Sequence, residues 1–124
     1  MVDEIQSGLG LFAYMHEAVS PDLLIIGKAL AGGFYPVSAV LASREILEVY
    51  KPGDHGSTFG GNPMGCAIAR TALHVLIEEK MVERSAELGA YLLTLLQTLR
   101  SPDLKDVRGK GLWIGIELRS PARP

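Results

Sequence analysis

The amino-acid sequence predicts an α/β fold, and three observations lead to this prediction. Residues 23–26 form a short, wholly apolar run, as expected of a strand that is covered on both faces of a sheet. Two longer stretches, from residue 62 and over 88–99, repeat apolar residues at helical spacing. Residues 111–118 alternate apolar with other residues, as a half-buried strand does. This order predicts α/β layers, with a smaller α+β segment beginning near residue 81.

The run after the first strand predicts a second strand and a short helix. The sequence "PVSAVLAS" (36–43) is the strand, and Ser43 is a suitable N-cap for a helix that continues through Tyr50. Pro52 and Gly53 should end this helix.

The composition of "HGSTFGGNP" (55–63) predicts a loop that leads into a longer helix. Asn62 would be its N-cap and Pro63 its first residue, which are the positions that these residue types favour. The apolar spacing then predicts a buried face formed by Ile68, Ala72, Val75 and Leu76.

A further helix and a last strand complete the predicted elements. The helix has leucines at positions i, i+4, i+7, i+8 and i+11, and "SPD" (101–103) stops it. In "GLWIGIEL" (111–118) the alternation predicts one apolar face. The leucines are Leu88, Leu92, Leu95, Leu96 and Leu99, and the strand face is Leu112, Ile114, Ile116 and Leu118.

Composition excludes several classes of protein. The chain has 124 residues, is 48% hydrophobic, and has a net charge of −2 without a long basic run, which argues against nucleic acid as a partner. No apolar run approaches the roughly 18–20 residues of a membrane span, and no secretory signal is present, so we expect a cytoplasmic protein. With three histidines and one cysteine, no metal-ligand spacing occurs. We expect Cys66 to be a small buried side chain.

The chain begins abruptly. "MVDEIQSG" alternates apolar and polar residues from its first position, without a lead-in, like a strand end that has been cut open. We therefore expect the sequence to be a fragment of a longer protein or a truncated reading frame.

Three familiar motifs are incomplete. "GLGLFA" (8–13) matches a loose dinucleotide fingerprint but lacks a full preceding strand and a suitably spaced acidic residue, although a nucleotide-binding module stays a third alternative. "GK" (27–28) lacks the other residues of a P-loop, and His16-Glu17 lacks the second histidine of a zinc protease motif.

Lys28 is the strongest candidate for chemistry. It stands between the apolar run at 23–26 and the glycine pair Gly32-Gly33, where a buried strand should end. One interpretation is a strand-end lysine that extends into solvent. The other is a partly desolvated amine, which can attack a carbonyl and form a Schiff base. The carboxyl end of a strand in an open α/β sheet is the usual place for a ligand.

Two further segments fit the second interpretation of Lys28. Asp3 could lie on a neighbouring strand end, and a carboxylate beside a pyridine ring with a lysine at its aldehyde is what pyridoxal phosphate requires. The loop 55–63 offers hydroxyl and backbone N–H groups before a helix, which is a reasonable phosphate cradle.

Together these segments resemble the class III (subgroup II) aminotransferases, which depend on pyridoxal phosphate. The resemblance runs over essentially the whole chain, in the order of the family. Within the family, two segments look most like enzymes that act on ornithine, with those that act on acetylornithine second. The matching segments are "DEIQSGLG", "PDLLIIGKALAGGFYPVSAV", "HGSTFGGNPMGCAIA" and "VRGKGLWIGIEL", and the two that resemble the ornithine enzymes are "GGFYPVSAVLAS" and "KPGDHGSTFGGNP".

The resemblance implies roles for individual residues. Lys28 would form the covalent link to the cofactor and move the proton, and Asp3 would pair with the pyridine nitrogen. Ile5 would pack on the ring, and Gln6 would bind its phenolic oxygen. Thr58, with Ser57 beside it, would reach the cofactor phosphate of the other subunit of a homodimer.

The resemblance also implies a partial type I aminotransferase fold. Residues 1–80 would be the C-terminal part of the large cofactor domain, and 81–124 the beginning of the small domain. The first half of the cofactor domain and the arginine that binds a substrate carboxylate would lie outside the chain, so Arg108 is not that arginine. About four residues that the family has between Gly10 and Leu11 are missing, which could shift Asp3 relative to Lys28.

The function that follows is transamination between ornithine, through its δ-amino group, and a 2-oxo acid such as 2-oxoglutarate. The alternatives are an acetylornithine or ω-amino acid aminotransferase, and a non-catalytic remnant of such an enzyme. The partners would be small amino and oxo acids, with neither nucleic acid, membrane nor metal involved.

Overall fold

The computed structural model describes residues 1–10 and 12–120 of the chain. The chain divides into two compact units, Met1–Glu79 and Lys80–Pro124, which we describe separately. That these units belong to the cofactor domain and to the C-terminal domain of a larger enzyme stays a prediction.

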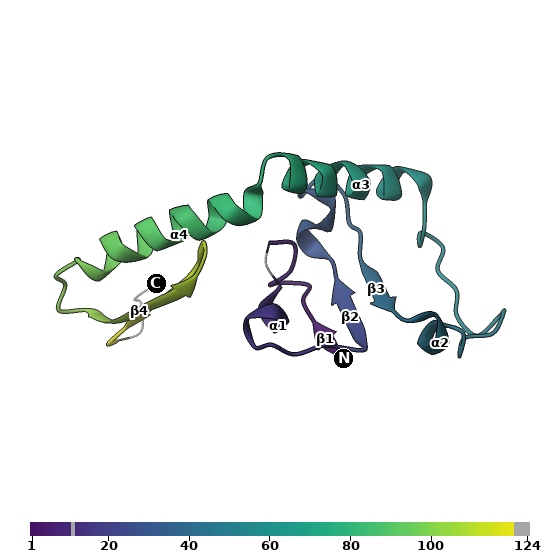
Figure 1. Cartoon of the computed structure of the whole chain (residues 1–124), viewed down its shortest axis with the longest axis horizontal. Helices are drawn as coiled ribbons and strands as arrows, with labels where there is room; N and C mark the ends of the chain where they lie inside the picture. The colour runs from purple at the N-terminus through teal and green to yellow at the C-terminus, as the bar shows by residue number, and fades with distance from the viewer. Residues whose placement is uncertain (11, 121–124) are drawn as a thin grey trace. The chain divides into compact units, whose positions relative to one another are not determined.

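A three-stranded sheet forms the base of the first unit (Figure 1). β1 (Val2–Asp3) pairs in parallel with β2 (Leu23–Ile26), which pairs antiparallel with β3 (Ala39–Ala42). The predicted strand at 23–26 is confirmed. The predicted strand at 36–43 is shorter than expected, since it begins three residues after Pro36, which has no N–H to donate to a ladder.

Four helical segments complete the first unit: α1 (Ala13–His16), the 3₁₀ helix η1 (Lys28–Ala31), α2 (Arg44–Leu47) and α3 (Pro63–Glu78). Both predicted N-caps are confirmed. The Ser43 hydroxyl accepts the backbone N–H of Ile46 at 3.4 Å, and Asn62 Oδ1 accepts that of Gly65 at 2.7 Å. α2 is shorter than predicted, and the sequence predicted neither α1 nor η1.

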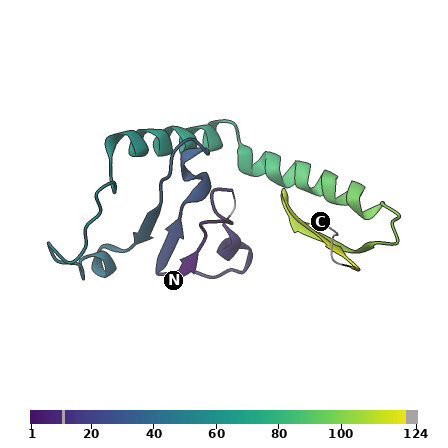
Figure 2. The same ribbon diagram turned by 180° about the vertical axis from the view of Figure 1, so that it is seen from behind.

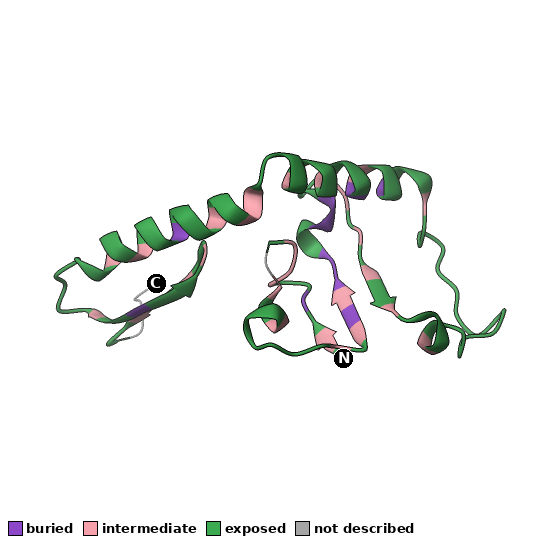
Figure 3. Ribbon diagram, in the orientation of Figure 1, coloured by how far each residue is buried: buried purple, intermediate pink, exposed green. Residues whose placement is uncertain are grey.

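The core of the first unit lies between β2, η1 and α3 (Figure 3). Its buried members are Leu24, Ile26, Leu30 and Ala69. Ala69, which was not predicted, is the buried apolar side chain of α3, because small residues let this helix approach η1. Of the predicted face, Ile68, Ala72 and Leu76 are half-buried, whereas the prediction for Val75 was wrong because it is exposed. Cys66 is also exposed, so its predicted burial was wrong.

The second unit is one helix packed on a hairpin (Figure 2). α4 (Met81–Gln97) contacts β4 (Leu104–Lys110) and β5 (Trp113–Leu118), which pair antiparallel with Lys110 opposite Trp113. The sequence did not predict β4, because Val107 is its one buried residue and charged residues dominate the rest.

The face of α4 that meets the hairpin differs from the leucine face that the sequence predicts. Four of the five predicted leucines are exposed, only Leu96 is half-buried, and Leu99 lies beyond the end of the helix. Of the strand face predicted over 112–118, Ile114 is half-buried, but Leu112, Ile116 and Leu118 are exposed, so that prediction was also largely wrong. The buried and half-buried residues of α4 are Met81, Val82, Ser85, Gly89, Leu93 and Leu96.

Gly89 explains this choice of face. A Cβ atom added at Gly89 would lie 2.1 Å from both the carbonyl carbon and the oxygen of Gly111, in the turn of the hairpin. The Ser85 hydroxyl lies beside the same turn and accepts the backbone N–H of Leu112 at 3.3 Å. Backbone contact at Gly89 therefore sets how α4 meets the hairpin, ahead of the leucine periodicity.

The substitution Gly89→Ala is expected to destabilise the protein by about 1–3 kcal/mol. The added methyl group would clash with the backbone of Gly111, which cannot adopt another rotamer as a side chain can. The gain in helix propensity, about 1 kcal/mol, offsets part of the steric cost. Denaturant unfolding of the complete natural chain measures the change. Gly56→Ala is the control, since its added methyl group meets no atom within 4 Å. Equal stability of the two variants would contradict the packing that we describe.

Two sequence features lie partly outside the described residues. These are Leu11 of the "GLGLFA" segment and residues 121–124 of the "SPARP" tail. Over the described ranges, no helix is both long and apolar enough to cross a membrane.

Candidate active site

Lys28 follows the end of β2 and is the first residue of η1, which ends just before the glycine pair Gly32-Gly33. The side chain is exposed, and the backbone has φ = +48°. For a residue with a Cβ atom this left-handed conformation costs roughly 1–2 kcal/mol, so the surrounding structure must impose it. Gly32, with φ = +58°, ends η1. Strained residues of this kind are common at functional sites.

The structure brings Gln6 and Lys28 together, although 22 positions separate them. Lys28 Nζ donates a hydrogen bond to Gln6 Oε1 at 2.7 Å. A lysine ammonium has three donors, so this bond orients the amine and leaves it able to bind another group.

Asp3 and Ile5 lie at the same end of the sheet. Asp3 is the last residue of β1 and pairs with Ile25 of β2, and its Oδ1 accepts the backbone N–H of Ile5 at 3.0 Å. Ile5 lies beside Gly27, since a Cβ atom added at Gly27 would be 3.5 Å from both Cγ1 and Cγ2 of Ile5. Lys28 and the segment that follows β1 therefore lie at the same end of the sheet. This is the carboxyl end of a parallel strand pair, where α/β sheets bind ligands.

Glu4 is a residue of this site that the sequence analysis missed, because acidic residues at strand ends are usually solvated. It is only 1% exposed. Burial raises the pKa of its carboxyl group, but hydrogen bonds from the Ser7 hydroxyl and from the backbone N–H groups of Tyr14 and Ala13 lower the pKa below its ordinary value. Glu4 is therefore ionised at neutral pH.

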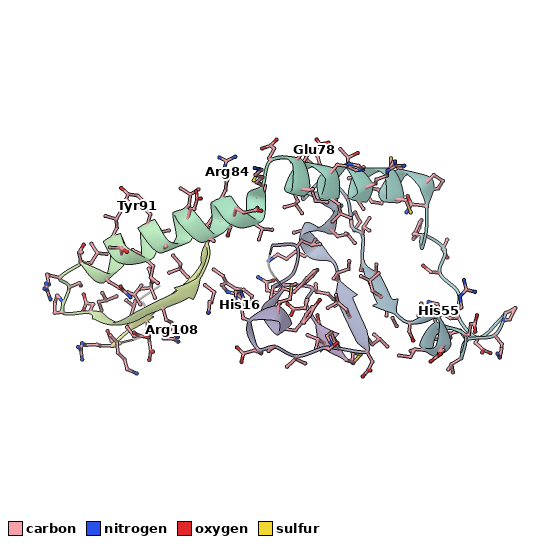
Figure 4. The ribbon with its side chains drawn as sticks, viewed as in Figure 1. His16, His55, Glu78, Arg84, Tyr91 and Arg108 are labelled. Atoms are coloured by element: carbon pink, nitrogen blue, oxygen red, sulfur yellow. The ribbon has the colours of Figure 1, made fainter. Side chains whose placement is uncertain are left out.

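Ser57 and Thr58 lie in a different part of the first unit. They belong to the loop between α2 and α3, where the Ser57 hydroxyl accepts the backbone N–H of Gly60 at 2.9 Å. Figure 4 labels His55, in this loop, beyond the β3 edge of the sheet, and His16, in α1, near the β1 edge. Among the described residues, no hydrogen bond joins Ser57 or Thr58 to Lys28, whose amine binds Gln6.

A hollow of about 720 Å³ lies next to the Ser57 loop. Its walls come from η1, β3 and α3, and they include Leu30, Ala39, Ser57, Cys66 and His74. Lys28 does not line this hollow.

Arg108 is engaged in a surface network on the hairpin of the second unit (Figure 4). Its guanidinium group donates to Asp106 at 2.7 Å and to Glu117 at 3.0 Å, and these bonds raise its pKa. Glu117 also binds Lys105, and the hydrogen bonds from Lys105 and Arg108 lower its pKa. No cluster of three or more metal-ligating side chains occurs in the part of the chain that is described.

The family model "Aminotransferase class-III" matches residues 1–124, which is the whole chain. The chain belongs to the class III aminotransferases.

Individual members of the class III aminotransferases are similar to the chain in both sequence and structure. The ornithine aminotransferase of Geobacillus sp. (strain WCH70) is 56% identical over the whole chain. The ornithine δ-aminotransferase of Plasmodium falciparum superposes with a TM-score of 0.87 and 49% identity over 94% of the chain. The acetylornithine aminotransferase of Elizabethkingia anophelis superposes with a TM-score of 0.90 and 49% identity over 94% of the chain.

The chain spans about a third of the length of these class III aminotransferases, with values of 32%, 32% and 31%. The predicted α/β class and the predicted partial aminotransferase fold are thereby confirmed. The Geobacillus alignment extends over 128 positions for the 124 residues of this chain, so four positions have no counterpart here. The shortening that we expected at Gly10–Leu11 stays a prediction, and Leu11 is outside the described residues.

Proposed function

We propose that the protein containing this chain catalyses pyridoxal-phosphate-dependent transamination. The amino donor is ornithine, through its δ-amino group, and the acceptor is a 2-oxo acid such as 2-oxoglutarate. The observation that carries the proposal is the group Asp3, Ile5, Gln6 and Lys28 at one end of a parallel strand pair, in a chain of this family. The names of the similar ornithine aminotransferases support the choice of donor.

The residues at this end of the sheet fit the cofactor. Lys28 offers an exposed amine, Asp3 an exposed carboxylate, and Ile5 an apolar side chain that is 37% exposed. When bound, pyridoxal phosphate supplies an aldehyde that condenses with amines and a ring that accepts the electron pair left at the reacting carbon.

Lys28 has two tasks in this proposal. Its Nζ atom anchors the cofactor in the resting enzyme, and it later takes a proton from the substrate carbon that bears the amino group. Gln6 Oε1 directs the amine towards the site by accepting its hydrogen bond. A positioned amine of this kind would act first as base and then as acid, since the proton taken from the substrate carbon must be delivered to a carbon of the cofactor.

Asp3 and Ile5 orient the ring. The Asp3 carboxylate binds the protonated pyridine nitrogen and keeps its positive charge, and the Ile5 side chain covers one face of the ring. The hydrogen bond from the Ile5 backbone N–H to Asp3 Oδ1 at 3.0 Å holds the carboxylate in place for this purpose.

Thr58 and Ser57 fit a role that needs a second subunit. They lie in the loop between α2 and α3, where the Ser57 hydroxyl binds Gly60, whereas the Lys28 amine binds Gln6. We propose a homodimer in which Thr58 reaches the phosphate group of the partner's cofactor. A cytoplasmic location belongs to the same proposal.

The second candidate function is transamination of acetylornithine. The observation that favours it is the TM-score of 0.90 with the acetylornithine aminotransferase of Elizabethkingia anophelis.

A substrate comparison tests the proposed function. The complete natural protein, supplied with pyridoxal phosphate and 2-oxoglutarate, is expected to form glutamate from ornithine at a higher kcat/KM than from N-acetylornithine. A higher kcat/KM for N-acetylornithine would select the second candidate. Turnover of neither compound, in a folded protein saturated with cofactor, would contradict both and leave the non-catalytic remnant.

A further inference from the structure

Glu4 is the one buried charged side chain in residues 1–10 and 12–120. Removal of a carboxylate from water costs several kcal/mol unless the protein supplies hydrogen bonds to replace the lost solvation. A buried carboxylate beside a candidate active site therefore needs an explanation.

The Glu4 carboxylate joins two segments of the first unit. Its Oε2 accepts the hydroxyl of Ser7, within the turn that follows β1. Its Oε1 accepts the backbone N–H of Tyr14 at 2.8 Å, in the first turn of α1. The side chain thus connects the turn after β1 to the start of α1.

The backbone of Glu4 fixes the same turn from its other side. The N–H group of Glu4 donates to the carbonyl oxygen of Ile25 at 2.9 Å, which extends the pairing of β1 with β2. The carbonyl oxygen of Glu4 accepts the N–H group of Gly8 at 2.7 Å, which closes the turn over residues 5–7.

The residues inside this closed turn face Lys28. Gln6 accepts the hydrogen bond of the lysine amine at 2.7 Å, and Ile5 lies beside Gly27, the residue that precedes the lysine. On the other side of Glu4, Asp3 accepts the N–H group of Ile5. Every predicted cofactor contact near Lys28 is therefore within two residues of the buried carboxylate.

We propose that Glu4 is a positioning residue, whose buried carboxylate holds the turn after β1 so that Asp3, Ile5 and Gln6 meet Lys28 in the geometry that the cofactor needs. The inference rests on the proposed function, since it concerns the same site. Glu4 acts through these residues and touches neither cofactor nor substrate itself.

Two substitutions of Glu4 change the hydrogen bonds of its carboxylate in different ways. Glu4→Leu keeps the side-chain size but leaves the Tyr14 N–H and Ser7 hydroxyl groups without their acceptor. Glu4→Gln keeps one oxygen for Tyr14, and its amide can donate to the Ser7 hydroxyl, which accepts as well as donates. Glu17→Leu and Glu17→Gln are the matched controls, because Glu17 is exposed at the end of α1.

The experiment uses the complete natural protein, at a temperature where circular dichroism shows each variant to be folded. In Glu4→Leu we expect the dissociation constant for pyridoxal phosphate to rise and kcat to fall by about 10- to 100-fold, since small displacements of reacting groups have costs of this size. The visible absorption band of the bound cofactor should shift, and Glu4→Gln should restore most of each property. The Glu17 variants should match the wild type.

A double-mutant cycle with Gln6→Ala separates positioning from a merely structural role. If Glu4 acts through the turn that carries Gln6, the effects of Glu4→Leu and Gln6→Ala on cofactor affinity should be clearly less than additive. Additive effects, or a folded Glu4→Leu protein with wild-type affinity, band and kcat, would overturn the inference. If Glu4→Leu does not fold, the same cycle with Ser7→Ala in place of Glu4→Leu decides by the same criterion, since Ser7→Ala removes one of the hydrogen bonds that hold the Glu4 carboxylate.

The outcome for the wild type distinguishes the two proposals. A wild-type protein that shows no Lys28-dependent absorption band with pyridoxal phosphate would overturn the proposed function itself. A normal wild-type band with unchanged Glu4 variants would overturn only the role of Glu4.

Discussion

Replacement of Lys28 by alanine is expected to lower kcat at least about 1,000-fold and to remove the visible absorption band of the bound cofactor. The variant loses both the amine that anchors the cofactor and the base that moves the proton, and acid–base catalysis alone contributes about 10²–10⁴-fold. Gln6 loses the partner that lies 2.7 Å from its Oε1 atom.

Steady-state kinetics and an absorption spectrum with added pyridoxal phosphate measure these losses. Lys28→Arg should be as inactive as Lys28→Ala, because arginine keeps its proton and cannot act as nucleophile or base. Lys51→Ala is the control, since Lys51 is exposed and its Nζ atom donates to the backbone oxygen of Glu48. Activity of Lys28→Ala within tenfold of the wild type would contradict the assignment.

The substitution Asp3→Asn is expected to lower kcat by about 10²–10³-fold, the range found when one preorganised electrostatic contact is lost. Asparagine has no charge with which to keep the pyridine nitrogen protonated. Its side-chain oxygen can still accept the N–H group of Ile5, as Asp3 Oδ1 does at 3.0 Å, so the local fold should persist.

The measurement compares kcat and circular dichroism of Asp3→Asn with those of Asp22→Asn. Asp22 is exposed and directly precedes β2, so it lies at the opposite end of that strand from Lys28. The control should have wild-type kcat. An equal, small effect of both substitutions would mean that Asp3 does not bind the ring nitrogen.

The sequence predicted those helices and strands that depend on neighbouring residues, such as an apolar run or a helix N-cap. The apolar run at 23–26 is β2, and Ser43 and Asn62 cap the helices that follow them. Contacts between distant segments determined the rest. The face of α4 depends on the approach of Gly89 to Gly111, which leucine spacing does not reveal.

The candidate active site was likewise predictable only in part, where local sequence signals determine it. Parallel pairing of β1 with β2 places Asp3 beside the strand that leads to Lys28, as the sequence suggested. The burial of Glu4 was not predictable from "VDEIQ", because Tyr14, ten positions later, supplies the hydrogen bond that allows it. The sequence "LLIIGKALAGG" does not predict the left-handed backbone conformation of Lys28 either.

The most direct test of the central claim is chemical trapping of the cofactor on the complete natural protein. After incubation with pyridoxal phosphate and reduction with borohydride, peptide mass spectrometry should find the reduced cofactor on Lys28 alone. Recovery of the adduct on another lysine instead, or of no adduct from a folded protein, would contradict the assignment of Lys28 as the residue that binds the cofactor.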